Sequence, residues 1–440
     1  MKGQIINSRK NSEYWPESQV VTCWQRQIYQ GRRFVAIDGQ SVEVLYPGRL
    51  NDSRGGDFRE AVILSGRKIQ QGNIEIHSRT SGWETHGHHL DPQYNQVVLH
   101  VAWQQDNAGI TRLENGQKIP TIVLDRDLAS MEAGRESFPC HQIPAIKLSA
   151  VLERLGEIRL GEKVRRFRWD LKAMGPEQAF YSGFLEALGY TKNQKPFLEL
   201  SALASIKVLK PLVKDDKDRI GVQAFLLGSA GLLPSQRGID NGGDRYIRDL
   251  ENGWNAGGFV QACSFPHWEI YKVRPGNYPV RRILALSDLL FRYRRLGWLE
   301  TWRRVLNKAV TGNSRVDLCA LLRVRAEGYW HSHRDFYLPQ TKGGGWLLGR
   351  ERAVEIIVNV VLPFFIVWSG QQGEMALATG LEKLYHGYPS GQTNSIQKHM
   401  LAQLKAKNSL INSACRQQGL LYLYKAYCTQ GRCVECYLNE

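Results

Sequence analysis

The sequence lacks an uninterrupted apolar run long enough to cross a bilayer. Its longest apolar stretch, 353–368, is broken by Glu355, Asn359 and Pro363, whereas a membrane-spanning helix needs about 20 consecutive apolar residues. We therefore expect a buried helix there and no transmembrane segment. Residues 1–15 are polar and lack the apolar core of a signal peptide, so we expect the protein in the cytoplasm.

Cysteine is scarce, with 8 residues in 440, and it is unevenly placed. Four cysteines lie singly along the chain, and the other four fall between positions 415 and 436. This is not the spacing of a small disulfide scaffold, so it favours a reducing compartment and a local cluster near the C-terminus. The sequence also lacks internal repeats and low-complexity tracts.

The composition is that of a globular protein, with 42% hydrophobic and 23% charged residues, so global disorder is excluded. A chain of 440 residues is long enough for two or three domains. The formal net charge is +16, and nearly all of the excess lies beyond residue 150. Such a charge favours polyanion partners, with nucleic acid first and an anionic membrane surface second.

The pattern of apolar residues changes near position 145. Strand-like segments lie before it, at 41–45, 58–64, 73–77, 97–103 and 121–128. Helical spacing follows, at 147–160, 176–188, 195–213, 222–232, 279–308 and 350–368. We therefore predict an α/β domain with a mixed sheet over 1–145, a basic and mostly helical domain over 146–412, and a Cys-rich tail over 413–440.

Polar side chains are concentrated between 48 and 103, and five of the eleven histidines lie between 77 and 100. On the strand 73–77, Glu75 and His77 share one face because successive side chains alternate. A five-residue hairpin loop at 65–69 would place Asp57 opposite His77 and diagonal to Glu75. A four-residue loop would put Asp57 on the other face, unless Gly72 forms a bulge.

Two carboxylates at the end of a hairpin suit Mg²⁺ or Mn²⁺, and a third polar group there can orient or activate water. Over 43–103 this pattern resembles the core of the PD-(D/E)xK nuclease superfamily. The resemblance implies that Asp57 and Glu75 hold the metal, with His77 in the place of Lys as water-orienting base or third ligand. No Pro precedes Asp57, which departs from the superfamily pattern.

A second metal hypothesis comes from the string 86–91. It resembles the His-x-His-x-Asp-His string of metallo-β-lactamase-type hydrolases, although positions 90 and 92 are Leu and Pro. A dinuclear zinc site is therefore an alternative. The further site candidates are Arg49, Asn51, His86, His88, His89, Asp91 and His100. Both hypotheses compete with a plain solvent-facing polar cluster.

Several stretches are similar to an uncharacterised bacterial family, a DUF2851-like domain of unknown function. They are 47–51, 83–89, 188–193, 226–234, 274–279, 349–352 and 417–420. The resemblance covers most of the chain, but it implies no activity.

The last cysteines form a second candidate site. The spacing of Cys428, Cys433 and Cys436 suits Zn²⁺, or an iron–sulfur cluster if a fourth thiolate converges on them. Some iron–sulfur nucleases of the same superfamily resemble this arrangement. Cys415 or Cys23 is the candidate fourth ligand, and the alternative is a set of unrelated thiols.

Arginines and aromatic residues alternate over 279–308, a composition that suits phosphate contacts and base stacking. The candidate nucleic-acid contacts are Arg281, Arg282, Arg292, Arg294 and Arg295. The alternative is an amphipathic helix whose arginine stems cover its own core. Together, these features predict a metal-dependent nuclease that cleaves phosphodiester bonds of DNA or RNA. The alternative is a non-catalytic nucleic-acid-binding or scaffold protein with a degenerate nuclease core.

Overall fold

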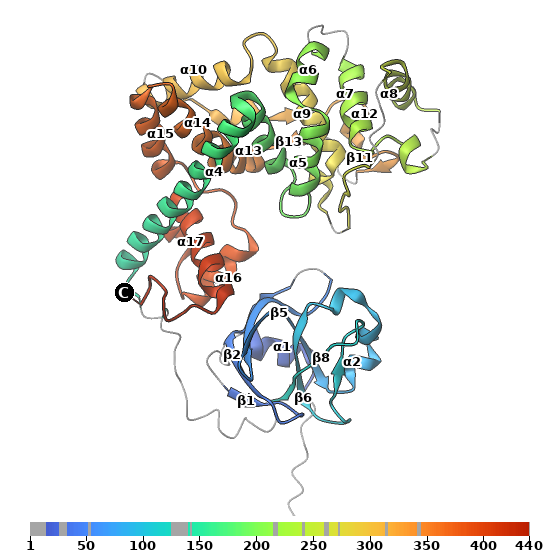
Figure 1. Ribbon diagram of the computed structural model, residues 1–440, viewed down its shortest axis with the longest axis vertical. Helices are drawn as coiled ribbons and strands as arrows, with labels where there is room; N and C mark the ends of the chain where they lie inside the picture. The colour runs from blue at the N-terminus through green and yellow to red at the C-terminus, as the bar shows by residue number, and fades with distance from the viewer. Residues whose placement is uncertain are drawn as a thin grey trace, which may run out of the picture. The chain divides into compact units, whose positions relative to one another are not determined.

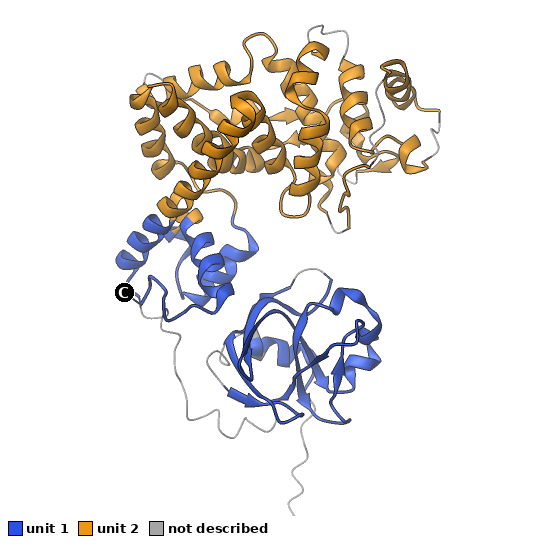
Figure 2. Ribbon diagram, viewed as in Figure 1, with its two compact units in different colours: residues 1–155, 393–410, 419–440 blue, residues 156–392, 411–418 orange. Residues whose placement is uncertain are grey.

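The computed structural model describes the chain in eleven segments (Figure 1). They are 15–25, 33–51, 54–124, 140, 143–213, 219–239, 243–258, 264–271, 273–312, 316–340 and 345–439. The chain forms two compact units (Figure 2). Unit 1 comprises residues 1–155, 393–410 and 419–440, and unit 2 comprises 156–392 and 411–418. The first boundary thus falls ten residues later than predicted, and most of the predicted tail belongs to the unit of the N-terminal sheet.

Unit 1 is built on a mixed sheet, as predicted. Its strands, in the order in which they pair, are β1 (Arg33–Val35), β2 (Ser41–Tyr46), β4 (Phe58–Ser65), β5 (Lys68–Arg79), β6 (Val97–Gln104) and β9 (Thr121–Val123), and β3 (Arg49–Leu50) pairs with β4. Neighbours are antiparallel from β1 to β5, and β6 runs parallel to both β5 and β9. A separate pair joins β7 (Thr111–Arg112) and β8 (Lys118–Ile119). Residues 125–128, predicted as the end of the last strand, lie outside the described residues.

The apolar face of this sheet packs against α1 (Glu17–Gln25), as Figure 1 shows. Ile74 and Ile76 of β5 are fully buried in the same core cluster as Val20 and Trp24 of α1. Seven of the eight residues of β6 are buried, which is typical of a central strand covered on both faces. Because β5 alternates, its two isoleucines leave Glu75 and His77 on the opposite face.

The hairpin between β4 and β5 is tighter than predicted. Ser65 pairs with Lys68, so the turn has two residues rather than five. An unbroken register from this turn would place Asp57 opposite Ile76, on the apolar face. The register instead shifts between Phe58 and Ala61.

This shift is a bulge in β4, not at Gly72 as the alternative prediction had it. Glu60 lies in the bulge with a φ of 58°, a left-handed conformation that is uncommon for a residue with a side chain. Beyond the bulge Phe58 pairs with Ile74, so the next position, Asp57, is level with Glu75. One extra residue in β4 therefore brings both carboxylates to the same face.

The C-terminal segments complete unit 1 with α16 (Ser395–Gln403), the end of α17 (Ala414–Ala426) and η9 (Cys428–Gln430). Tyr46 on β2 lies 2.6 Å from His399, measured from the hydroxyl oxygen to Nε2. The hydroxyl of Tyr424 donates to Glu60 Oε2 at 2.5 Å. These polar contacts join the last part of the chain to the strands β2 and β4.

Unit 2 is mostly helical, as predicted. Its longer helices are the larger part of α4 (Ala145–Leu188), α5 (Gln194–Leu203), α6 (Ile206–Leu212), α7 (Arg219–Ser229), α8 (Arg245–Ala256), α9 (Pro279–Tyr293), α10 (Trp298–Thr311), α13 (Arg350–Ile356), α14 (Leu362–Gln371) and α15 (Met375–Gly387). Shorter elements are α11 (Leu318–Leu322), α12 (Tyr329–Ser332), the strand pair β10 (Val324–Arg325) and β13 (Trp346–Leu348), and the pair β11 (His333–Asp335) and β12 (Leu338–Pro339).

The long apolar stretch of the sequence runs through α13, a π-helical turn at Ile357–Val361 and α14. Arg350–Gln371 is long and apolar enough to span a membrane by length and composition alone. However, 78% of its most apolar 18-residue window is buried within the structure, which is typical of the core helix of a globular protein. This is the buried helix predicted for 353–368.

Candidate metal centre

Asp57 and Glu75 lie side by side on the polar face of the sheet. The backbone N–H of Asp57 donates to Glu75 Oε2, and the backbone N–H of Ile76 donates to Asp57 Oδ2. Both distances are 3.0 Å. Each carboxylate is thus anchored to the neighbouring strand. Asp57 was predicted to face His77 but faces Glu75 instead, because the turn and the bulge together shift the register by two.

Ionisation is disfavoured at both carboxylates, of which Glu75 is buried and Asp57 is half-buried. Burial, followed by the repulsion of Glu75, raises the pKa of Asp57 to about 7. Burial, with a contribution from Glu17, raises the pKa of Glu75 to about 8. Glu17, at the start of α1, is a third carboxylate that raises the pKa of both, and sequence reasoning missed it. Such a group of acids favours a bound cation or retained protons.

Three histidines lie beside the carboxylates. His77, His86 and His88 each offer one ring nitrogen, and the three nitrogens lie within 4.8 Å of one another. Glu75 Oε1 is 3.0 Å from His88 Nε2 and 3.8 Å from His77 Nε2. Three imidazole nitrogens and one carboxylate oxygen therefore converge on a small region.

The local backbone explains how His86 and His88 reach His77. Both follow the short helix α2 (Gly82–Thr85), and Gly87 between them has a φ of 72° that turns the chain back. A Cβ on Gly82 would lie only 2.6 Å from the His77 ring, so glycine at this position permits the close approach of α2.

A chain of hydrogen bonds holds His77 from behind. Its Nδ1 lies 3.0 Å from Nε2 of His100, whose Nδ1 lies 2.8 Å from the hydroxyl of Thr111. That hydroxyl lies 2.7 Å from the hydroxyl of Thr121. Burial, followed by neighbouring imidazoles, lowers the pKa of His77 to about 2 and of His100 to about 3, so both rings are neutral. When His77 donates from Nδ1 to His100, its Nε2 keeps a lone pair for a metal.

The donor set differs from the one expected for Mg²⁺. Three imidazoles with one carboxylate suit Zn²⁺ or another transition metal better than Mg²⁺, which prefers oxygen ligands. The two metal hypotheses of the sequence thus overlap at one place, where His86 and His88 lie beside Glu75. His86 is exposed, so the cluster is open to solvent on that side.

The remaining candidates of this region are not among the converging donors. The side chain of Asp91 accepts from the backbone of Gln93 and caps the next helical turn, and His89 is not among the converging histidines. Arg49 pairs with Glu60 at 2.9 Å. Asn51 donates to the carbonyl of Gly56 at 2.8 Å and so shapes the loop that precedes Asp57.

In unit 2, the first two arginines of the predicted nucleic-acid surface are buried in α9. Arg281 donates from Nη1 to the carbonyls of Trp330 and His333, and Arg282 donates to the carbonyl of Leu347. Only 1% of Arg281 and 4% of Arg282 is exposed, so neither guanidinium is accessible to a phosphate, contrary to the prediction. Burial, followed by the charge of Arg282, lowers the pKa of Arg281 to about 10.

The other three arginines lie at the end of α9 and just beyond it, with Arg292 in the last turn and Arg294 and Arg295 after the helix. Arg292 and Arg295 are exposed, and Arg294 is partly exposed. Arg292 is ion-paired with Asp288 at 2.9 Å, whereas Arg294 and Arg295 line a cavity of about 670 Å³.

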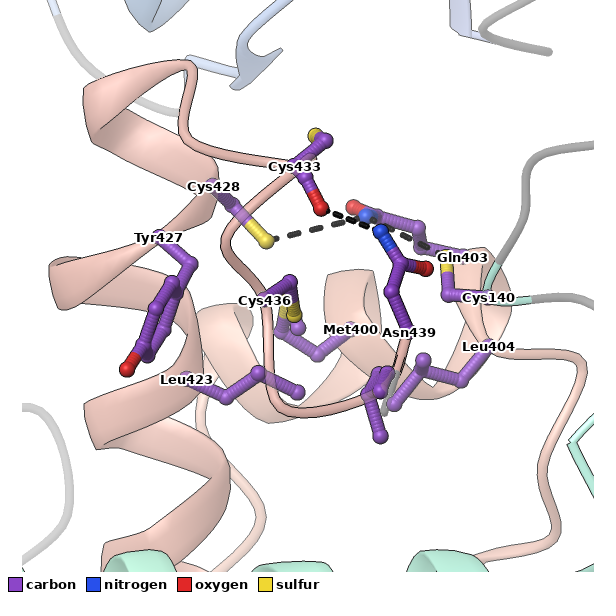
Figure 3. Close-up of a pocket in the computed structure, with 11 residues that line it drawn as sticks. Cys140, Met400, Gln403, Leu404, Leu423, Tyr427, Cys428, Cys433, Cys436 and Asn439 are labelled. Carbon is purple, nitrogen blue, oxygen red and sulfur yellow. Dashed lines mark hydrogen bonds between the residues drawn. The ribbon is translucent and has the colours of Figure 1, made fainter.

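The C-terminal cysteines are divided between the two units. Cys428, Cys433 and Cys436 line one pocket in unit 1, together with Cys140 (Figure 3). Cys415, one of the two candidate fourth ligands, is fully buried in the core cluster of unit 2 and does not line this pocket. The side chain of Cys23 lies outside the described residues.

Comparison with known proteins identifies the family of the chain but does not indicate an activity. The model of a family described as "Protein of unknown function (DUF2851)" matches residues 17–394. No curated protein and no solved structure matches the chain. The match covers most of the chain, including the carboxylates and histidines of the candidate centre, and the chain therefore belongs to the DUF2851 family.

Proposed function

We propose that this protein is a metal-dependent hydrolase that cleaves phosphodiester bonds of DNA or RNA at the centre around Glu75. One observation carries the proposal: the nitrogens of His77, His86 and His88 lie within 4.8 Å of one another, beside a buried carboxylate. Donors at this spacing need little rearrangement to surround one ion, whose charge would offset the repulsion between Asp57 and Glu75.

The residues of the centre have separable roles in this proposal. His77, His86, His88 and Glu75 hold the metal. A metal bound there supplies charge stabilisation of the phosphate and lowers the pKa of bound water. Asp57 would act as general base for that water, because it lies beside Glu75 without belonging to the converging donors.

The surroundings of His77 favour the role of ligand over that of base. A ring with a pKa lowered to about 2 by burial cannot retain a proton at neutral pH. Its Nδ1 is held by His100 at 3.0 Å, which fixes the direction of Nε2 toward Glu75 and His86. We therefore assign His77 to metal binding, in contrast to the Lys of the nuclease superfamily that this segment resembles.

The phosphodiester substrate is supported by charge and by the second unit. The chain carries a net charge of +16. The cavity of about 670 Å³ in unit 2 combines basic and aromatic side chains, as do sites that bind single-stranded nucleic acid. Its basic residues are Lys210, Arg294 and Arg295, and its aromatic residues are Phe180, Tyr181, Tyr293 and Trp298. Glu177 also lines the cavity and is ion-paired with Lys210, so Arg294 and Arg295 are the cations on which the substrate proposal depends.

The test is a cleavage assay on labelled single- and double-stranded DNA and RNA, with Zn²⁺, Mn²⁺, Mg²⁺ or chelator. We expect cleavage with Zn²⁺ or Mn²⁺ and none with chelator. His88→Ala should abolish the cleavage, and His89→Ala is the matched control because His89 is not part of the converging set. If pure wild-type protein cuts no substrate with any metal, the alternative of a non-catalytic binding or scaffold protein replaces this proposal.

A further inference from the structure

Four cysteines from distant parts of the chain line one small pocket in unit 1 (Figure 3). Cys140 lies a few residues before α4, whereas Cys428 begins η9, and Cys433 and Cys436 follow in the last turns. The sequence suggested the last three through their spacing but gave no sign of Cys140. Folding of unit 1 thus supplies a fourth thiol.

The four thiols are close enough to influence one another. Gln403 Nε2 lies 4.0 Å from Cys140 Sγ and 3.7 Å from Cys428 Sγ, so these two sulfurs flank one amide group. Burial raises the pKa of Cys140 to about 11, with further contributions from Cys433 and Cys436. Burial also raises the pKa of Cys428, and the other three thiols add to the shift.

The surroundings of the thiols suit a buried inorganic group better than a reactive thiol. Cys428 and Cys436 are 6% and 9% exposed, and the rest of the lining is largely apolar. A positively charged metal centre would stabilise four thiolates in such a pocket.

The local backbone supports ligation by the last three cysteines. The N–H of Cys436 donates to the carbonyl of Cys433 at 3.2 Å, which closes a tight turn between the two thiols. Asn439 donates from Nδ2 to the carbonyl of Cys433 at 2.5 Å. Its backbone N–H donates to the carbonyl of Cys436 at 2.8 Å. The tail is therefore folded around the thiols rather than extended.

The spacing of the sulfurs distinguishes one zinc ion from a larger centre. Zn–S bonds of ~2.3 Å in a tetrahedron place sulfurs roughly 3.8 Å apart. Among the residues that the structure describes, three potential ligand atoms lie within 4.8 Å of one another only in the histidine cluster of unit 1. The cysteine sulfurs do not form such a group. No three of the four sulfurs therefore lie as close together as a zinc tetrahedron requires.

We propose that Cys140, Cys428, Cys433 and Cys436 ligate an iron–sulfur cluster that joins the C-terminal segment to the residue ahead of α4. Each thiol binds as a thiolate and releases its proton, and the protein supplies one ligand to each iron of a four-iron cluster. The cluster is separate from the candidate centre around Glu75 and would serve to stabilise unit 1.

The test is the iron, acid-labile sulfide and zinc content of the full chain purified without oxygen, with its visible absorption spectrum. We expect about four iron and four sulfide per chain. Cys140→Ser should lose at least half of the iron and lower the melting temperature. Cys415→Ser, the matched control from the core of unit 2, should keep the full iron content.

The proposal is overturned by zinc without iron, or by neither metal with the four thiols alkylated in the folded wild-type protein. Reconstitution of wild-type protein with iron and sulfide provides a second readout if Cys140→Ser does not fold. A cluster that fails to form there also overturns it. His88→Ala should retain its iron, so failure of the cluster and failure of the proposed hydrolase are distinguishable.

Discussion

At the candidate centre, burial shifts the pKa values of the acids and of the histidines in opposite directions, and in both cases it disfavours the charged form. Asp57 and Glu75 have raised pKa values, chiefly because burial disfavours their charged forms. His77 and His100 have lowered pKa values for the same physical reason. At neutral pH the metal-free centre therefore has unprotonated imidazoles that can bind a transition metal, whereas Glu75 largely retains a proton that a bound metal ion would displace.

The pKa shifts predict how stability of the metal-free protein depends on pH. In the unfolded chain, carboxyls ionise near pH ~4 and histidines are neutral above about 6.5. From about pH 4 to 8 the folded state therefore holds more protons than the unfolded chain, on Asp57 and Glu75, so these carboxyls make stability fall as pH rises. Below about 6.5 the histidines act in the opposite direction, because only the unfolded chain takes up their protons.

Thermal unfolding of chelator-treated protein measures this effect. We expect the melting temperature to decrease from pH 6.5 to 8 more steeply in the wild type than in the double variant Asp57→Asn, Glu75→Gln. Added Zn²⁺ should raise the wild-type melting temperature more at pH 8 than at pH 6.5. Parallel pH profiles of the two proteins would show that the carboxylates are not held at raised pKa values.

At the scale of elements, alternation along a strand was predictable from the sequence and register was not. Ile74 and Ile76 identified the apolar face of β5, and thereby the polar face with Glu75. The position of Asp57 depended on a two-residue turn and a bulge at Glu60. The sequence around Glu60 does not predict a left-handed conformation. Its carboxylate contacts Arg49 and Tyr424, and Tyr424 lies near the far end of the chain, so these contacts could not be read from the local sequence.

The approach of α2 to β5 gives a prediction at this scale. A methyl group on Gly82 would lie 2.6 Å from the ring of His77, so Gly82→Ala should push α2 and His86 away from the centre. We expect metal affinity to fall by roughly 10- to 100-fold, as for other residues that position ligands. Metal titration followed by calorimetry measures the loss. Thr85→Ala, an exposed change on the same helix, is the control, and equal affinities for the two variants would contradict the assigned geometry.

At the scale of the whole molecule, the sequence predicted the mixed sheet, the helical second unit and the buried apolar helix. Contacts between segments that are distant in the chain could not be predicted from the sequence. Glu17 reaches the carboxylates from a helix near the start of the chain, and Cys140 meets cysteines almost 300 positions later. No spacing along the chain encodes such contacts, because they arise from packing of elements that are remote in sequence.

The basic cavity of unit 2 gives a prediction for the full-length protein. Arg294→Ala with Arg295→Ala should weaken binding of single-stranded nucleic acid by about 10-fold or more and reduce the salt dependence by about one ion per lost phosphate contact. Arg304→Ala is the control, because Arg304 is ion-paired with Glu300 and does not line the cavity. Binding isotherms at several salt concentrations measure both effects. An unchanged salt slope in the double variant would place nucleic acid elsewhere.

The most direct test of the hydrolase proposal measures bound metal and cleavage in the same samples of wild type, Glu75→Gln and Asp57→Asn. We expect the wild type to bind about one transition-metal ion at this centre, in addition to any iron held by the four cysteines, and to cleave. Glu75→Gln should lose both properties because a ligand is removed. Asp57→Asn should retain most of the metal and lose cleavage because the general base is removed. Cleavage that persists in Glu75→Gln, or a metal-loaded wild type that cleaves no nucleic acid, would contradict the assignment.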